Sequence, residues 1–336
     1  MKTLLLLSLA AGALLFSGCS SKQYFEPEDT LSASGAESSF GGTIIDVSRD
    51  GATLAGGGYI DKSGVHNISL GEGFRFLSES GNYILASNAE GMFRLIDKTS
   101  GKVIKEVKMQ PPVVSASVRN GLVAYILENN AFGLYSIKED RKIVENRSER
   151  TYAIDSRAAS PLFIDTLVVM PMLDGKLVIF DTHNPEAMKV VYLSSDKVFN
   201  NVIYLERMGD SLVAATPKKL LTLGTEGEFE YKKNVADVAI GGKYVYLFTK
   251  EGDIVKLDIA LEPLAAKKFK FAQFVAATVY KNRVYALDKQ GSLIVLSPDL
   301  GKYKIYDVGE VDSPVFVANG KLYKDGEIIH LERLSY

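Results

Sequence analysis

Short apolar runs separated by turns that contain glycine recur from residue 43 to the end of the chain. Pairs of such runs align on seven positions that lie 39, 45, 45, 32, 39 and 38 residues apart: Tyr83, Leu122, Leu167, Leu212, Tyr244, Arg283 and Lys321. Glycine at the turn between two runs, as in Glu90-Gly91 and Asp174-Gly175, provides a positive φ without steric cost. The pattern predicts repeated pairs of antiparallel strands.

Two further short strands flank each pair. Four short antiparallel strands in a unit of about 40 residues are typical of a β-propeller blade, whereas helical repeats show a 3.6-residue period and leucine-rich repeats are shorter. Residues 54–70 resemble residues 317–334, and counting them as a blade gives eight, with seven as the alternative. The sequence therefore predicts an all-β propeller of four-stranded antiparallel blades.

The two terminal units each lack a fourth strand. Residues 43–48, TIIDVS, are predicted to supply it beside the C-terminal strands, so that an N-terminal strand closes the ring and leaves no open edge. Residues 43–336 are predicted to form this single propeller domain. Residues 19–42 are rich in Ser, Gly and Glu without apolar periodicity, and we expect them to be a flexible tether.

The N-terminus has a different pattern. Lys2 precedes an apolar run from Leu4 to Phe16, which Ser17 and Gly18 connect to Cys19, the only cysteine of the chain. This order predicts a secretory signal peptide over residues 1–18, and the run is shorter than the roughly 20 residues that span a bilayer. An ordinary signal peptide with an incidental cysteine is the alternative to a lipid-bearing one.

Small residues before a cysteine resemble the lipobox of bacterial lipoproteins. The resemblance implies cleavage before Cys19 and lipid attachment, palmitate included, at that residue. The next residue is Ser20 rather than Asp, which favours the outer membrane over retention in the inner membrane. Acyl chains hold a protein on a bilayer without any spanning helix.

Charge and candidate chemistry narrow the function. A formal charge of −2 provides no basic field for nucleic acid. His66, His183 and His330 are isolated in the sequence, although His66 and His330 occupy matching places in the two terminal units. No hydrolase, phosphate-binding or metalloprotease motif occurs. We expect no catalytic residues, no metal and no cofactor.

Several units resemble the PQQ-type propeller repeat, which is also WD40-like in architecture. Its core appears at Glu90-Gly91 through Asp97, at Asp174-Gly175 through Asp181, and at Glu251-Gly252 through Asp258. Quinoprotein dehydrogenases of this fold use tryptophan to lock blades together and to stack on the quinone. This chain has no tryptophan, so no quinone site is predicted.

A lipobox together with these repeats resembles the propeller lipoproteins of the outer-membrane β-barrel assembly machine. The resemblance implies a monomeric, non-catalytic scaffold, anchored in the outer membrane and facing the periplasm, that binds envelope proteins. Two alternatives stay open: an accessory subunit of a periplasmic respiratory or transport complex, and a divergent periplasmic enzyme with its site in the central channel.

Overall fold

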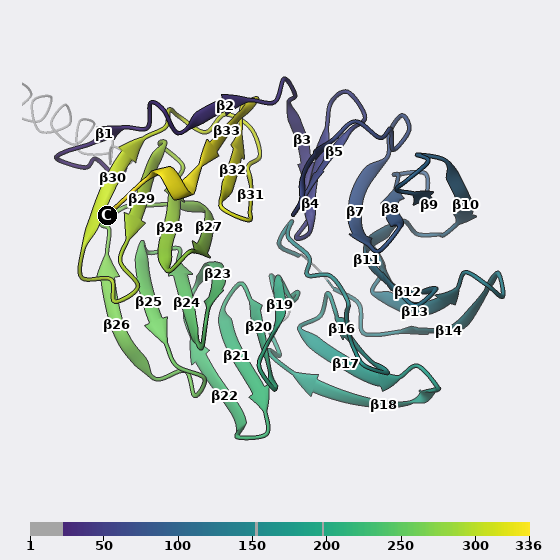
Figure 1. Cartoon of the computed structure of the whole chain (residues 1–336). Helices are drawn as coiled ribbons and strands as arrows, with labels where there is room; N and C mark the ends of the chain where they lie inside the picture. Colours follow the sequence, from purple (N-terminus) through teal and green to yellow (C-terminus); the bar gives the residue numbers. More distant parts are fainter. Residues whose placement is uncertain (1–22, 152–153, 197) are drawn as a thin grey trace, which may run out of the picture.

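Eight β-sheets are arranged as the blades of a ring in the computed structural model, which describes residues 23–151, 154–196 and 198–336 (Figure 1). The predicted signal peptide and Cys19 lie outside the described residues. In the part of the chain that is described, no helix is long and apolar enough to cross a membrane. The predicted eight-bladed, all-β propeller is confirmed.

Each blade contains four antiparallel strands. In blades 1 to 7, the first of these strands in the chain lines the central channel, and the fourth lies at the rim. The first four blades are β3 (Ile44–Val47), β4 (Gly51–Leu54), β5 (Tyr59–Asp61) and β6 (Gly64–His66); β7 (Arg75–Ser80), β8 (Tyr83–Ser87), β9 (Met92–Asp97) and β10 (Val103–Lys108); β11 (Val113–Arg119), β12 (Leu122–Leu127), β13 (Ala131–Ser136) and β14 (Arg141–Arg147); β15 (Leu162–Ile164), β16 (Leu167–Pro171), β17 (Lys176–Asp181) and β18 (Asn184–Tyr192).

The next three blades follow the same order along the chain. They are β19 (Tyr204–Met208), β20 (Ser211–Thr216), β21 (Lys219–Gly224) and β22 (Gly227–Lys232); β23 (Val235–Gly241), β24 (Tyr244–Thr249), β25 (Asp253–Leu257) and β26 (Pro263–Lys268); β27 (Phe274–Tyr280), β28 (Arg283–Asp288), β29 (Ser292–Leu296) and β30 (Tyr303–Asp307). Blade 8 contains β31 (Phe316–Ala318), β32 (Lys321–Lys324) and β33 (Glu327–His330), after which the 3₁₀ helix η1 (Leu331–Arg333) ends the chain's regular structure.

The hydrophobic core is divided among the eight interfaces between neighbouring blades, each of which has its own apolar cluster. Middle strands such as β20 and β29 are buried on both faces, whereas the outer strands β10, β22 and β26 have only exposed and half-buried residues. This explains why the middle strands read as continuous apolar runs in the sequence.

Tyrosines act between blades in place of the missing tryptophans. Tyr246 of blade 6 is fully buried and donates a hydrogen bond of 2.8 Å to the Pro298 carbonyl of blade 7. Tyr285 of blade 7 donates one of 3.0 Å to the Leu331 carbonyl beyond blade 8. A buried tyrosine thus combines a large apolar surface with a polar link to the next blade.

An N-terminal strand closes the ring, but it is not the strand expected from the sequence. β2 (Glu37–Ser39) pairs antiparallel with β33 and becomes the outer strand of blade 8 (Figure 1). Residues 44–47, within the segment expected to close the ring, instead form β3, which pairs with β4. The physical reason is that blade 1 needs β3 as its inner strand, since β4, β5 and β6 provide only three.

Residues 25–39, here called the N-terminal strap, are bound to the rim of the propeller. The prediction of a flexible tether over residues 19–42 is therefore wrong for this part. Phe25 contacts Phe269 edge to face at 5.9 Å. β1 (Leu31–Ser32) adds a parallel fifth strand to β30 of blade 7. Ala33 and Ala36 are buried in the cluster between blades 7 and 8. Small side chains let the backbone lie close to the sheet edges.

Breaking the β2–β33 ladder should destabilise the whole ring. The His330 amide donates to the Ala36 carbonyl at 2.8 Å and the Phe40 amide to the Gly326 carbonyl at 3.0 Å. By the alternation of an antiparallel ladder, the Ser38 amide between them faces β33. Ser38→Pro should lower the free energy of unfolding by about 1–3 kcal/mol, measured by urea denaturation.

Ser39→Pro is the matched control, because the Ser39 amide faces outward from the sheet edge, where proline is tolerated. Equal losses of stability in the two variants would contradict closure through this ladder.

Candidate functional site

The three histidines do not form a common site. His66 Nε2 lies 2.9 Å from Asp61 Oδ1, His183 Nδ1 lies 3.0 Å from Asp181 Oδ1, and His330 Nε2 lies 2.9 Å from Ser38 Oγ. His66 and His330 therefore have separate partners, although their blades are neighbours. No group of three or more His, Cys, Asp or Glu residues that could hold a metal occurs among the described residues.

Asp61 is fully buried and is the common partner of Ser63, His66 and Lys98. Burial alone would raise its pKa, but hydrogen bonds from Ser63 and His66 lower the pKa of Asp61 to about 2. Lys98 Nζ lies 3.2 Å from its other oxygen. This carboxylate therefore stays ionised and holds blade 1 against Lys98 of blade 2, which is a structural role.

Arg49 crosses the central channel. A cavity of about 810 Å³ is lined by the inner strands, and Arg49 reaches across it from the β3–β4 turn of blade 1. Its guanidinium donates to Asp237 Oδ1 at 2.9 Å and to the Val238 carbonyl at 3.1 Å, both on blade 6. It also lies 4.4 Å from the ring centroid of Tyr204 on blade 5. Arg49 thus braces opposite sides of the ring.

Asp237 extends this brace to a further blade, because its Oδ2 accepts a hydrogen bond of 3.2 Å from the Ala277 amide on blade 7. Arg157, also at the channel, is paired with Asp155 at 2.7 Å and donates to the Ala236 carbonyl. The arginines that line the channel are therefore engaged with carboxylates and backbone of the ring itself.

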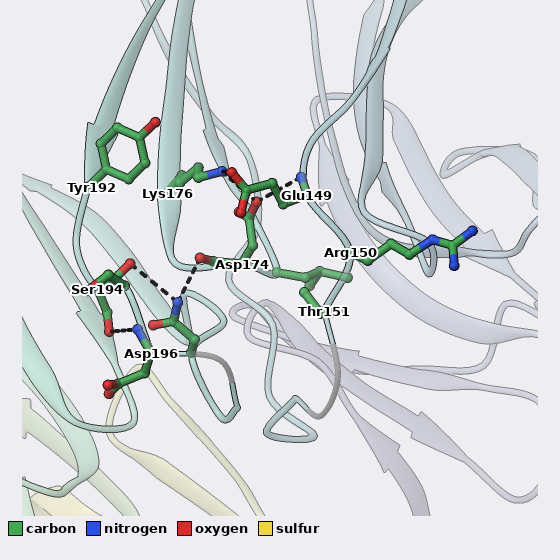
Figure 2. A pocket seen from close by; sticks show the side chains of 11 residues that line it. Glu149, Arg150, Thr151, Asp174, Lys176, Tyr192, Ser194 and Asp196 are labelled. Carbon is green, nitrogen blue, oxygen red and sulfur yellow. Dashed lines mark hydrogen bonds and ion pairs between the residues drawn. The ribbon is translucent and has the colours of Figure 1, made fainter.

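A second pocket, of about 510 Å³, lies beside blade 4 (Figure 2). Lys176 Nζ forms its floor, 3.1 Å from both Glu149 Oε1 and Asp174 Oδ2. Burial would lower the pKa of Lys176, but hydrogen bonds to Asp174 and Glu149 raise it, so the lysine stays charged. Asn200 Nδ2 donates to the Asp174 carbonyl at 2.7 Å and to that of Ser194 at 3.3 Å. These contacts fix the loops around the pocket.

Large apolar side chains are exposed at the end of β18 and on the two loops that line this pocket. Tyr192 is 62% exposed, Phe199 49%, Val198 40% and Ile154 37%. Phe199 also has a φ of 50°, which is an outlier for a bulky residue and holds it on a strained loop. We call these four residues, together with the pocket, the blade-4 surface. Exposed aromatic residues around a preorganised polar pocket are typical of protein interfaces.

Unpaired polar atoms also gather under the blade-4 surface. Of the buried side-chain oxygens and nitrogens in the described ranges, three lack a hydrogen-bond partner, and two of these are Asp174 Oδ1 and Asn200 Oδ1. Each such atom costs about 1–3 kcal/mol. The third atom, Tyr59 Oη, lies in the cluster between blades 1 and 2, so two of the three unpaired atoms are at this one pocket. Such a local cost agrees with a functional role of the pocket.

The repeat spacing holds a signal for this surface that the sequence analysis did not use. The segments 148–161 and 193–203 on either side of blade 4 are the longest connections between blades. They account for the two spacings of 45 residues between aligned units, whereas the other spacings are 32 to 39 residues. Long loops on a rigid scaffold commonly carry function.

Fold and surface together define the class of this protein as an eight-bladed β-propeller, closed by its own N-terminal strand, with an extended loop surface beside blade 4. No family model matches the chain, the PQQ-type repeat included.

The proteins that are similar to this chain include two curated relatives and, among many solved structures, the two given below. The chain is 29% identical over 378 residues to the plasminogen-binding protein PgbB of Helicobacter pylori strain J99, covering 95% of this chain and 70% of that protein. It is 28% identical to PgbB of strain 26695, over 95% of this chain and 69% of that protein. BamB from Moraxella catarrhalis superposes with a TM-score of 0.65 at 14% identity, covering 86% of this chain and 93% of BamB. The C-terminal WD40 domain of Sif2 gives a TM-score of 0.61 at 11% identity, over 86% and 96%. The predicted BamB-like propeller fold is confirmed.

The surroundings of His330 on blade 8 predict that the stability of the protein depends on pH. Burial, together with Arg333 and Lys321, lowers the pKa of His330, and Glu332 opposes this only in part. The unfolded chain therefore binds a proton at His330 more readily than the folded chain does. The stability that the neutral His330 contributes is full above about pH 6.5, and it is lost as the pH falls from there to the lower pKa of the folded state. His330→Gln should make the fall in melting temperature between about pH 6.5 and 5 shallower.

His183→Gln is the control, because His183 is exposed on blade 4, away from β2. Parallel melting curves against pH for wild type and His330→Gln would contradict a role of this histidine in the closure.

Proposed function

We propose that this protein is a non-catalytic, lipid-anchored scaffold that binds other proteins through the blade-4 surface. The observation that carries the proposal is the set of exposed apolar side chains, Tyr192 at the end of β18 and Phe199 on the loop that follows foremost, around a fixed polar pocket. A few exposed aromatic anchors with a polar surround supply most of the binding energy in protein interfaces. The propeller provides the rigid frame on which these loops sit.

Two kinds of partner are supported by the comparisons. Similarity to PgbB along 95% of the chain favours plasminogen, the partner named for those relatives. The propeller fold shared with BamB, together with the lipobox, favours a component of the outer-membrane assembly machinery. Both are proteins, and the blade-4 surface is our proposed site for either.

Anchoring at Cys19 is part of the proposal and leads to a direct test. Mass spectrometry of the mature protein should show an N-terminal, acylated Cys19, and membrane fractionation should recover the protein with the outer membrane. Cys19→Ala should abolish acylation, because the thiol is the attachment point. A mature chain that begins at another residue without lipid would contradict anchoring.

Binding is tested with the double variant Tyr192→Ala, Phe199→Ala. Loss of the two side chains should weaken affinity by at least about 30-fold, because truncation of even one interface anchor costs about 2 kcal/mol or more. Plasminogen and the periplasmic domains of the barrel insertase serve as separate analytes in biolayer interferometry. The analyte that binds wild type identifies the class of partner.

Leu264→Ala is the matched control, because Leu264 is 52% exposed on the outer strand of blade 6. It should bind as wild type does. Unchanged affinity of the double variant for an analyte that wild type binds would exclude the blade-4 surface as the site.

A further inference from the structure

The N-terminal strap reaches the propeller at the rim of blades 6 and 7. Phe25 lies against Phe269, and β1 then follows β30 toward blade 8 (Figure 1). Cys19 is six positions before Phe25 in the sequence. At no more than about 3.6 Å per residue, this rim therefore lies within roughly 20 Å of an acyl group on Cys19. The step rests on the anchoring proposed above.

Four lysines without ion pairs lie on β26, on β30 and on the residues next to these strands, which adjoin this point of entry. Lys267, Lys270, Lys302 and Lys304 have no carboxylate of the described residues within the 4.0 Å limit of an ion pair. Their neighbour Lys268, in contrast, is paired with Asp253 at 3.1 Å. Unpaired lysines at one place on a surface attract an anionic partner.

Exposed aromatic rings lie among these lysines. Lys267 Nζ is 4.6 Å from the ring centroid of Tyr303, which is 43% exposed, and Lys270 Nζ is 4.7 Å from that of Phe271, which is 37% exposed. Phe269 contacts Tyr303 edge to face at 5.3 Å and so joins the rings to Phe25. We call the four lysines with Tyr303 and Phe271 the anchor-side patch. Lysine combined with exposed aromatic rings is typical of surfaces that lie at a membrane interface.

Acidic residues of the strap limit the strength of this patch. Glu26, Glu28 and Asp29 are exposed nearby in the chain and form no ion pair with its lysines. They reduce the net positive charge, so the patch by itself binds an anionic surface weakly. A chain already held by an acyl anchor experiences a high effective concentration of lipid, and a weak contact is then enough to orient it.

We propose that the anchor-side patch docks on the anionic phospholipid headgroups next to the acylated Cys19. Docking through this rim fixes the orientation of the propeller on the membrane. β18 of blade 4 lies across the ring from β30 (Figure 1), so the blade-4 surface is directed away from the lipid and toward a partner in solution.

The absence of tryptophan permits a direct test with single-tryptophan probes. The full-length acylated chain carrying Tyr303→Trp is reconstituted in vesicles that contain brominated phosphatidylglycerol, and Tyr192→Trp on blade 4 is the matched control. Bromolipid should quench Trp at position 303 at least about twofold and leave the probe at position 192 unchanged, because quenching needs contact with the lipid. Equal quenching of the two probes, or none at 303, would overturn the proposal.

The charge of the patch is tested in the same system. Lys270→Glu with Lys302→Glu should lower the equilibrium constant of docking at least about tenfold, since each lysine near an anionic surface contributes roughly fivefold to it. Quenching of the 303 probe should therefore fall to the level of the 192 probe. Lys189→Glu with Lys233→Glu changes the net charge equally on blades 4 and 5 and should leave quenching intact. Equal effects of the two pairs would overturn headgroup recognition.

Failure of the anchor and failure of the patch give different results. If mass spectrometry shows an unmodified Cys19, the anchoring proposal fails. The same chain is then sedimented with vesicles of phosphatidylglycerol and of phosphatidylcholine at low ionic strength. Sedimentation with phosphatidylglycerol alone, lost in the Lys270→Glu, Lys302→Glu pair, would support the patch without the anchor. Equal sedimentation with both lipids, or with neither, would overturn it.

Discussion

The backbone ladder between β2 and β33 is the interaction on which the rest of the ring depends. It joins the two ends of the propeller, since the His330 amide donates to the Ala36 carbonyl at 2.8 Å. Beside the ladder, the Ser38 and His330 side chains, 292 positions apart in the chain, lie 2.9 Å from each other. Without β2, blade 8 would expose the edge of β33, and the buried alanines of the strap would leave the cluster between blades 7 and 8. Every blade packs on two neighbours, so the spacing of all eight is fixed only once this ladder forms.

Links across and between blades support the closed ring from inside. Arg49 connects blade 1 with blades 5 and 6, and the carboxylate that it binds also accepts an amide of blade 7. A charge taken out of water is expensive unless it is paired and hydrogen-bonded, and here both conditions hold. Buried tyrosines add a hydrogen bond from one blade to the next. The channel is therefore a braced core of the ring.

The architecture could be predicted from the sequence because it depends on local features that repeat. Turn glycines such as Gly91 and Gly175 and the apolar middle strands specify the blades one by one. The strap could not be predicted, because β2 has three residues, all exposed, and its partner strand lies at the other end of the chain. Nor could the exposure of Tyr192 and Phe199, since aromatic residues in a strand-rich chain are usually core. Only the longer spacing of the units around them distinguishes that region.

Ring closure and orientation have a common physical origin in the N-terminal strap. The strap that completes blade 8 also leads back to Cys19, so the closing contacts hold the ring and its proposed attachment point together. A domain tethered only by a flexible chain would present its loops in every direction, and a partner would have to bear the entropic cost of fixing them. In the proposed arrangement, docking of the strap along blades 6 to 8, together with an acyl anchor at Cys19, removes most of that freedom before any partner arrives. On that proposal, the residues that the sequence predicts to be a tether give the blade-4 surface its direction.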